Sequence, residues 1–466
     1  MITPHCKQTD SQPYTDDDAR KDLKKLVSYA SVSDNPDQEQ QKALKNLSGY
    51  LCELFGKTGP EKIGVLDVPS ANPVVYGTWK AAVDPAPTVL LYAHYDVVRA
   101  DEKWDEPDNP GADPFTLYEH KGRLYGRGAA DDKSGIIMHL STLRALKGHL
   151  PVNVILVMEG EEEIGTGSLD RYIQAHPEQF QADVIVIADT GNAVEGTPTL
   201  TTSLRGLVAA DVTVSTLDHA VHSGMFGGPA PDAFMVLSRM ISSLVDWRGD
   251  VAVAGLTRTS DAQWPHSSPE EEATFRDQAG VRGGVQLVGS GSITQRVAGS
   301  PSINVVGLDG MPGTANSVNQ LHPSATARIS VRIAPDQSPD DAYQALRTHL
   351  LNAAPLGVVP TIKQSSAGDG YHIRAGGGRF FETACKAAQD AYPDAKECIR
   401  SGLGGTIPMI NIIAGVQSRA DTTVVMWGCE EPTCRIHGPV ESVSYRELEC
   451  MTRAEINLLK YVGAKP

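Results

Sequence analysis

Short, continuous runs of apolar residues alternate with helix-length segments over the first two hundred positions. Runs of this kind at residues 89–92, 152–158 and 184–188 are typical of parallel strands that are covered on both faces. Between them, apolar residues recur three or four positions apart over 132–146 and 168–175, which predicts helices. This alternation indicates a layered α/β domain built on a mostly parallel sheet.

The other elements of this layer lie before and after these runs. Their apolar spacing predicts helices at 16–30, 38–55, 379–391 and 445–460 and strands at 63–66, 74–79, 409–413 and 423–426. Residues 1–15 carry no such pattern, and we expect them to be frayed. The domain is therefore expected to comprise residues 1–203 and 370–466.

The pattern changes between residues 204 and 369. The expected elements are a strand at 207–215, a helix at 230–244, strands at 302–308 and 325–333, a helix at 339–351 and a strand at 358–363. This β-α-β-β-α-β order is that of ferredoxin-like domains, and residues 247–301 interrupt it as a long insertion. The sequence thus predicts an α/β domain into which a ferredoxin-like α+β domain, residues 204–369, is inserted.

The charge balance excludes one class of function. The chain has 41 Lys and Arg against 57 Asp and Glu, a net charge of −16, whereas a nucleic-acid-binding protein needs a basic surface. No apolar run approaches the roughly 20 residues of a membrane helix, and the first residues lack the apolar core of a signal peptide. We therefore expect neither nucleic acid nor a membrane among the partners.

The cysteines indicate the compartment. There are seven, an odd number with irregular spacing, which favours reduced thiols and a cytoplasmic location. Cys429 and Cys434 could hold a zinc ion with two further ligands, but the chain has no second pair of this kind. Ordinary thiols are the alternative.

Metal-type ligands follow the buried strand at 89–92. His94 and Asp96 are two residues apart on an extended segment, so the carboxylate can orient a metal-bound imidazole through its second ring nitrogen. The alternative is a histidine at a strand end beside a solvated aspartate. Asp131 and Asp132 open the next helix, where an aspartate also serves as an ordinary cap.

The acidic segment 158–163, which contains Glu161, Glu162 and Glu163, directly follows the buried strand at 152–157, where the chain leaves the carboxyl edge of the sheet. An acidic run is ordinarily a solvated face, but open α/β sheets place their ligands at this edge. Carboxylates packed there repel one another unless protons or cations neutralise them. We therefore expect a metal site in which one remaining carboxylate acts as a general base.

Two more candidates complete the set. Asp189 stands at the end of another buried strand, and His437 lies in a late loop of the same domain. Histidine, aspartate and glutamate without cysteine suit two zinc, manganese or cobalt ions. Two ions about 3.5–4 Å apart activate a bridging water and polarise a carbonyl group.

These motifs resemble those of the dinuclear metallopeptidase family that includes carnosine dipeptidases, aminoacylase, acetylornithine deacetylase and glutamate carboxypeptidase. The matching segments are LLYAHYDVV, LYGRGAADDKSG, MEGEEEIGTGS, IADT, HSGMFGG, SVRIAP, GGTIP and the loop at His437. They extend over about residues 90–440, and HSGMFGG and GGTIP most resemble the dipeptidase branch.

The resemblance implies a role for each residue of the metal centre. The terminal ligands would be His94 and Asp189 for one metal and Glu163 and His437 for the other, with Asp131 as the bridge. Asp96 would orient His94, and Glu162 would be the general base. The family often has a cis peptide after the bridging aspartate, here between Asp131 and Asp132.

For the inserted domain, the resemblance implies a lid that also forms a homodimer. His222 would reach into the active site of the other subunit and stabilise the developing oxyanion. The substrate contacts would come from Arg332, Asn316, Gly405, Thr406 and His372. Judged without the resemblance, His222 could cap a loop and Arg332 could point outward from its strand.

The expected function is that of a two-metal hydrolase, with zinc as the first choice of metal, that cleaves the amide bond of a small peptide, most simply a dipeptide. An N-acyl amino acid deacylase with the same metal centre is the alternative, and a panel of substrates would separate the two. A non-catalytic binding protein on the same scaffold would be expected to lack ligands or the base, whereas all are present here.

Overall fold

The computed structural model describes residues 16–34, 36–100, 102–165, 167–259, 268–374 and 377–464. Residues 1–15, which we expected to be frayed, lie outside these ranges. By its internal packing the chain divides into two units. The first comprises Met1–Thr202, Ile373–Ser401 and Met409–Pro466, and the second comprises Ser203–His372 and Gly402–Pro408.

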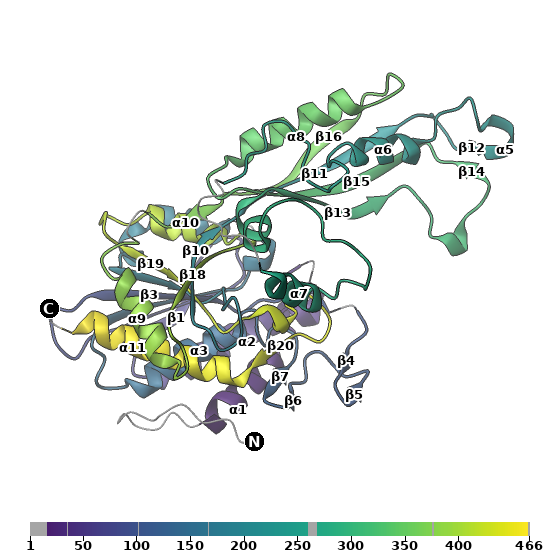
Figure 1. The fold of residues 1–466 in the computed structure, drawn as a ribbon. Helices are drawn as coiled ribbons and strands as arrows, with labels where there is room; N and C mark the ends of the chain where they lie inside the picture. The colour runs from purple at the N-terminus through teal and green to yellow at the C-terminus, as the bar shows by residue number, and fades with distance from the viewer. Residues whose placement is uncertain are drawn as a thin grey trace. The chain divides into compact units, whose positions relative to one another are not determined.

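The first unit is built on a mixed sheet whose central strands are parallel (Figure 1). The strands of this sheet include, in bonding order, β1 (Lys62–Leu66), β2 (Val74–Trp79), β8 (Asn153–Glu159), β3 (Thr88–His94), β9 (Val184–Ile187), β19 (Thr423–Met426) and β10 (Thr199–Leu204). The strands β8, β3, β9 and β19 are parallel, with His94 beside Glu159 and Tyr92 beside Ile187. Their carboxyl ends therefore meet at one edge of the sheet.

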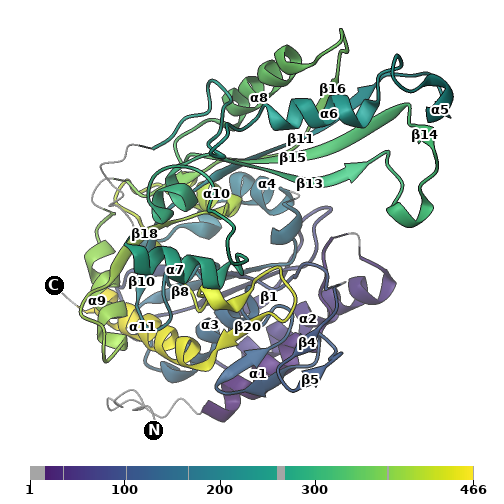
Figure 2. The same cartoon turned by 45° about the vertical axis from the view of Figure 1, so that its right-hand side comes forward.

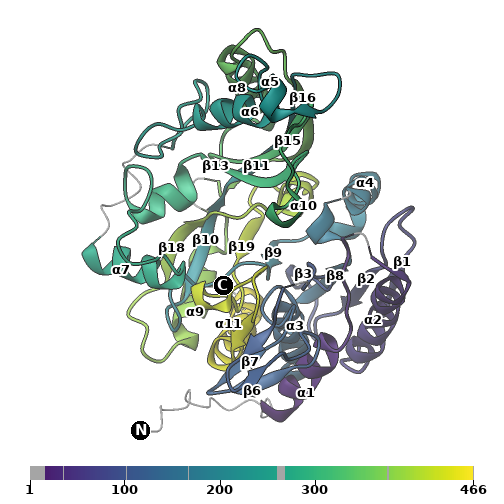
Figure 3. The same ribbon diagram turned by 90° about the vertical axis from the view of Figure 1, so that its right-hand side faces the viewer.

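Helices of this unit bury the apolar faces that their spacing predicted. In α2 (Gln38–Gly56) the leucines at positions 44, 47, 51 and 54 are all buried, and Asp37 caps the first turn by accepting the Gln40 N–H at 2.8 Å. The helix α3 (Lys133–Ala145) packs on β3. The closing helix α11 (Tyr445–Gly463) packs on α3 and on α9 (Phe381–Ala391) (Figure 3).

One predicted strand is wrong. Residues 409–413 form part of helix α10 (Pro408–Gly415), in which Met409, Ile410 and Ile413 are buried. Met409 and Ile410 each lie about one helical turn before Ile413. A short apolar run does not by itself distinguish a buried strand from a buried helix. The sheet instead gains two strands without a strong apolar pattern, β10 and its neighbour β18 (Ile399–Leu403).

The second unit contains the predicted split βαβ arrangement (Figure 2). Its antiparallel sheet has the order β13 (Ser302–Asp309), β15 (Ser324–Ile333), β11 (Gly206–Ser215) and β16 (Thr361–Gly368). The helix α6 (Ala233–Ser242) packs on β15 and β11, and α8 (Pro339–Ala353) packs on β11 and β16. The fold class is confirmed, although β16 begins three residues later than predicted.

Smaller elements complete the two units. The remaining helices are α1 (Asp16–Val27), α4 (Ser168–Ala175), α5 (Ser223–Phe226) and α7 (Pro269–Gln278), with short turns at Glu162–Ile164, Pro177–Phe180, Gln295–Gly299, Thr314–Asn316 and Pro432–Cys434. The remaining strands are β4 (Asp105–Glu106), β5 (Asn109–Pro110), β6 (Tyr118–His120), β7 (Arg123–Tyr125), β12 (Val221–His222), β14 (Gln320–Leu321), β17 (Tyr371–His372) and β20 (Ser442–Ser444). No helix in the described ranges is long and apolar enough to cross a membrane.

Candidate metal centre

The carboxyl end of β3 places His94 and Asp96 in the interior of the first unit, where both are fully buried. The Nδ1 atom of His94 lies 3.4 Å from Asp96 Oδ1, and its Nε2 atom lies 2.9 Å from Asp131 Oδ1. Burial alone would lower the pKa of His94, but hydrogen bonds to Asp131, Asp189 and Asp96 raise it well above its usual range. Asp96 therefore holds the imidazole from behind while Nε2 faces the other carboxylates.

Asp131 lies between two histidines. Its Oδ1 contacts His94, and its Oδ2 lies 3.0 Å from His437 Nε2. Burial opposes its ionisation, yet the hydrogen bonds from the two histidines hold the pKa of Asp131 well below its usual range. The Asp131–Asp132 peptide bond is cis, as the resemblance implied. Asp132 caps α3 by accepting the Gly135 N–H at 3.2 Å, so it serves the helix.

The acidic run leaves β8 and turns immediately, so that Glu162 and Glu163 open a short 3-10 turn. Their backbone N–H groups each donate to Asp96 at 3.2 Å. Glu163 Oε2 lies 3.1 Å from His437 Nε2. Glu161 instead accepts the backbone N–H of Asn72 at 3.0 Å. The structure thus separates two glutamates of the run, which face the cluster, from a third that supports the loop.

Asp189 and His437 approach the cluster from two further elements. Asp189 follows β9, and its Oδ1 lies 3.8 Å from His94 Nε2. His437 lies in the loop between β19 and β20, where its side chain is 56% exposed. Hydrogen bonds to Asp131 and Glu163 raise the pKa of His437 to about 11. All five candidate ligands therefore gather at one end of the sheet.

The donor set fits divalent cations. Burial, reinforced by neighbouring carboxylates, raises the pKa of Glu162 well above its ordinary value and that of Glu163 to about 7. In the absence of cations, the ionised forms of Glu162 and Glu163 are thus disfavoured. Bound cations would neutralise the repulsion between these carboxylates. Sets of ligand atoms within 4.8 Å of one another are His94, Asp131 and Glu163; His94, Glu162 and Asp189; and Asp131, Asp189 and Glu430. Within the described residues no such set includes Cys429 or Cys434.

Glu430 was missed by sequence reasoning. Glu430 comes after the end of β19, as Asp189 comes after the end of β9. The argument that ligands lie at the carboxyl ends of parallel strands could therefore have found Glu430 as well. Burial and the carboxylates of Asp131 and Asp189 raise the pKa of Glu430 well above its ordinary value. Its Oε1 is buried and has no hydrogen-bond partner within the described ranges. A buried acceptor of this kind is a further sign that the cluster suits a cation.

Glu441 was also not assigned a role. Its carboxylate accepts the backbone N–H groups of Gly128, Ala130 and Asp131 at 2.9–3.1 Å, and the Arg127 guanidinium at 2.7 Å. It therefore holds the loop that presents Asp131. The sequence offered only a weak signal, because the loop after His437 departs from the usual pattern of the resembling family.

The second unit carries the other candidates. His222 is exposed at the end of β12 and caps α5, its Nδ1 accepting the Gly224 N–H at 3.1 Å. Asn316 is exposed in a short turn, and His372 on β17 lies 3.9 Å from Asp336. The structure thus contains the capping contact that we considered as an alternative for His222.

Arg332 and Thr406 are joined within the second unit. Arg332 Nη1 donates to the Thr406 hydroxyl at 2.7 Å, and that hydroxyl donates to the Arg205 carbonyl oxygen at 2.6 Å. Gly405 precedes Thr406 and is partly exposed. Burial and the nearby Arg332 lower the pKa of Arg205 to about 10. Two guanidinium groups this close favour an anion beside them, and sequence reasoning had not assigned Arg205.

A parallel α/β sheet that presents histidine, aspartate and glutamate donors at its carboxyl edge defines a candidate two-metal centre of a hydrolase. Residues 90–461 match the model of peptidase family M20/M25/M40, and the chain belongs to this family. The expected family is thereby confirmed.

Relatives of the chain include dipeptidases. It is 35% identical over 452 residues to a cysteinylglycine-S-conjugate dipeptidase of Corynebacterium striatum, covering 95% of each chain. Its fold is similar to that of human carnosine dipeptidase 1, with a TM-score of 0.82 and 21% identity over 96% of each chain. It is also similar to the dipeptidase Dug1p of Saccharomyces cerevisiae, with a TM-score of 0.80 and 21% identity over 97% of this chain and 96% of that one.

Proposed function

We propose that the protein is a metal-dependent dipeptidase that hydrolyses small peptides of the cysteinylglycine type. The observation that carries this proposal is the gathering of two histidines and several carboxylates at one sheet edge. The substrate class is supported by the Corynebacterium striatum relative, which is a dipeptidase for S-conjugates of cysteinylglycine.

The ligands of the metal centre divide into two sets. One divalent ion would be held by His94 and Asp189, the other by Glu163 and His437, with Asp131 shared. Zinc is our first choice, and manganese or cobalt suits the same donors. When bound, the two ions supply an activated water and polarise the scissile carbonyl group.

Glu162 is the proposed general base. Its side chain faces His94 and Asp189, and its backbone N–H is held by Asp96. Burial raises the pKa of Glu162, and a carboxylate with a raised pKa accepts a proton more readily than an ordinary one. Glu162 takes a proton from the attacking water and delivers it to the nitrogen of the departing amine.

The second unit, near the predicted residues 204–369, is the proposed lid and substrate-binding domain. Arg332 and Thr406 would bind the substrate carboxylate, which restricts cleavage to chain ends. Asn316, Gly405 and His372 would complete the substrate contacts, and all of these assignments stay proposals.

We further propose a homodimer in which His222 stabilises the oxyanion in the active site of the other subunit. Met225 and Phe226, three and four residues after His222, are 76% and 49% exposed. The edge strand β13 exposes Val306 and Leu308. Exposed apolar groups beside an edge strand favour association with another chain.

The six cysteines in the described ranges are free thiols, which supports the proposed cytoplasmic location.

The test is a substrate panel combined with one substitution. The purified protein, loaded with zinc, manganese or cobalt, is offered cysteinylglycine, its S-conjugates and β-alanylhistidine, alongside N-acetyl and N-succinyl amino acids. We expect turnover of dipeptides. Turnover confined to the N-acyl amino acids would overturn the proposal in favour of a deacylase.

Glu162→Ala should retain the metal, as measured by mass spectrometry of the native protein, while turnover falls by at least about 100-fold, the usual contribution of a general base. Glu161→Gln is the matched control in the same acidic run, because Glu161 supports Asn72. Surviving turnover in Glu162→Ala would show that the base is assigned to the wrong residue.

A further inference from the structure

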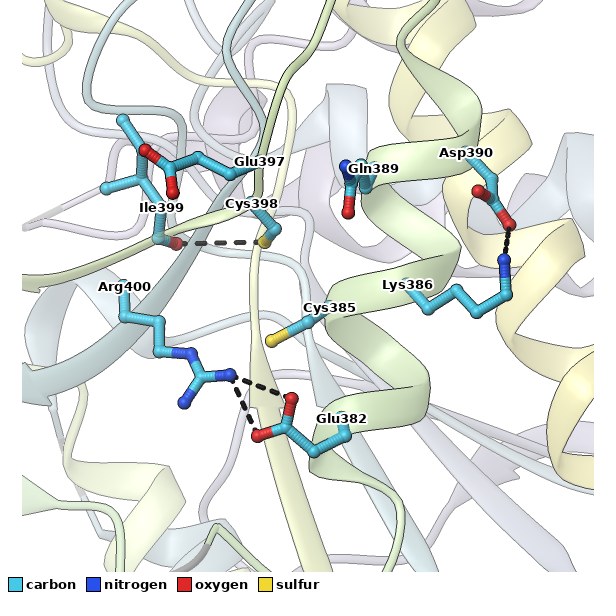
Figure 4. Close-up of a pocket in the computed structure, with 9 residues that line it drawn as sticks. All are labelled: Glu382, Cys385, Lys386, Gln389, Asp390, Glu397, Cys398, Ile399 and Arg400. Atoms are coloured by element: carbon cyan, nitrogen blue, oxygen red, sulfur yellow. Dashed lines mark hydrogen bonds and ion pairs between the residues drawn. The ribbon is translucent and has the colours of Figure 1, made fainter.

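A second cluster of reactive side chains lies in the first unit, between α9 and the segment that leads into β18. It lines a cavity of about 860 Å³, a size typical of small-molecule sites. Cys385 comes from the helix, Cys398 precedes the strand, and Arg400 lies on the strand (Figure 4). Within the described residues, none of these three belongs to a set of metal-type ligands.

Both cysteines line this cavity, one from the helix and one from the segment before the strand (Figure 4). Both are free thiols, with Cys385 buried and Cys398 partly buried. The Cys398 thiol donates to the carbonyl oxygen of Ile399 at 3.7 Å, as the dashed line in Figure 4 marks. A bond between the two sulfurs needs them to approach to about 2.05 Å, so the Cys398 side chain must turn away from Ile399 to form it.

The surroundings favour a thiolate at Cys385. The neighbouring Cys398 thiol, together with the guanidinium of Arg400, lowers the pKa of Cys385 to about 7. The neighbouring Cys385 and burial raise the pKa of Cys398 above its ordinary range. Arg400 is itself held by Glu382, whose two carboxylate oxygens each lie 2.8 Å from Nη2. At neutral pH the pair therefore combines a nucleophilic thiolate with a neighbouring thiol, as in redox-active cysteine pairs.

We propose that Cys385 and Cys398 form a dithiol site that reduces low-molecular-weight disulfides and becomes a reversible intramolecular disulfide. The Cys385 thiolate attacks one sulfur of the small disulfide RSSR, forming a mixed disulfide and releasing RS⁻, which takes a proton from water. Cys398 loses its proton to water and attacks the Cys385 sulfur, releasing the second RS⁻, which in turn takes a proton from water. Two protein thiols are thereby oxidised, and one RSSR is reduced to two RSH.

The cavity fits a metal site less well than a dithiol site. Soft metal ions bound by cysteine take three or four ligands, and only two sulfurs are present here. Lys386 also lines the cavity and adds a positive charge. This charge repels a metal cation and attracts the anionic thiolates that form during disulfide exchange. A dithiol site gives a role to both cysteines and to the guanidinium of Arg400.

The first test uses the full-length, unmodified protein and does not depend on peptidase activity. Iodoacetamide trapping followed by peptide mapping gives the alkylation rate of each cysteine over a range of pH. We expect the rate at Cys385 to rise with a midpoint near pH 7. Cys52 is the internal control, because burial raises its pKa above that of an ordinary thiol.

The size of the expected difference follows from two opposing effects. A thiol with a pKa of about 7 is about half ionised at pH 7, whereas one with a pKa of 9 or more is about 1% ionised. The more acidic thiolate is about tenfold less nucleophilic. At pH 7 Cys385 should therefore react at least about fivefold faster than Cys52.

The second test follows the two steps separately. With hydroxyethyl disulfide, the unmodified protein should lose about 2 Da and yield a linked peptide that joins Cys385 to Cys398, reversed by dithiothreitol. Cys398→Ser should stop at a mixed disulfide on Cys385. Cys52→Ser, the matched control, should behave as the unmodified protein does.

Two results would overturn the proposal. One is a Cys385 that alkylates no faster than Cys52. The other is a mixed disulfide that persists on the unmodified protein without a Cys385–Cys398 link. Both are measured on the unmodified chain, so a substituted protein that fails to fold leaves the decision intact.

Discussion

Replacing Glu441 with glutamine tests how the loop that carries Asp131 is held. The Glu441 side chain is 1% exposed. Its Oε1 accepts the N–H groups of Ala130 at 2.9 Å and Asp131 at 3.1 Å. Its Oε2 accepts the Gly128 N–H at 3.0 Å and Arg127 Nη1 at 2.7 Å. One carboxylate thus satisfies four donors from a single loop.

A glutamine retains only one of these two oxygens. In either orientation its NH₂ group faces two donors, so two hydrogen bonds to a charged acceptor are lost. Each such bond contributes about 1.5–3 kcal/mol, so Glu441→Gln should lower the free energy of unfolding by about 3–6 kcal/mol. That is a large part of the roughly 5–15 kcal/mol that stabilises a folded protein. Displacement of Asp131 should also weaken divalent-metal binding about 10–100-fold.

The assay measures both quantities separately. Guanidinium unfolding in the presence of a chelator gives the stability of the metal-free chain, and competition with a metal-sensitive dye gives the metal affinity. Glu447→Gln is the matched control, because buried Glu447 accepts the Gly196 N–H at 2.6 Å and the Tyr392 hydroxyl at 2.7 Å. It should lose stability and keep its metal affinity. A Glu441→Gln protein with unchanged metal affinity would refute the reasoning.

Two further outcomes are expected. Removing the metal with a chelator should lower the free energy of unfolding by about 2.7 kcal/mol for each ion that had been present at about 100 times its Kd, because an ion that binds only the folded chain stabilises it by mass action. An unchanged denaturation midpoint would contradict this. Arg332→Lys loses the 2.7 Å hydrogen bond to Thr406 and should raise KM for a dipeptide about 10–100-fold. A C-terminally amidated dipeptide offers no carboxylate, and an equal loss on that substrate would count against the proposed role.

The gathering of the candidate ligands was predictable because parallel strands bring their carboxyl ends to one edge. A buried apolar run followed by polar residues was enough to mark His94, the acidic run at 161–163 and Asp189, while the choice of Glu163 within that run depended on the family resemblance. The register that sets His94 beside Glu159 then brings these strand ends together. The split βαβ order of the second unit was predictable for a similar reason, since its strands alternate clearly between apolar and polar positions.

Other features depend on tertiary packing, which no local pattern records. The segment around Met409 is apolar and buried in either a strand or a helix, so its run of residues did not decide between them. Glu441 acquires its role only because its loop folds back under Gly128. Cys385 and Cys398 lie on a helix and before a strand, and their spacing matches no metal or redox motif.

Asp96 connects His94 to the turn that carries Glu162 and Glu163. Asp96 faces His94 Nδ1 at 3.4 Å and also accepts the backbone N–H groups of Glu162 and Glu163. Any shift of the acidic turn therefore disturbs the carboxylate that orients His94. Glu441 constrains Asp131 from the opposite side. Because these contacts are buried and charge-assisted, the ligand geometry is set by the folded chain before any ion binds, and metal binding must be coupled to the stability of the whole first unit.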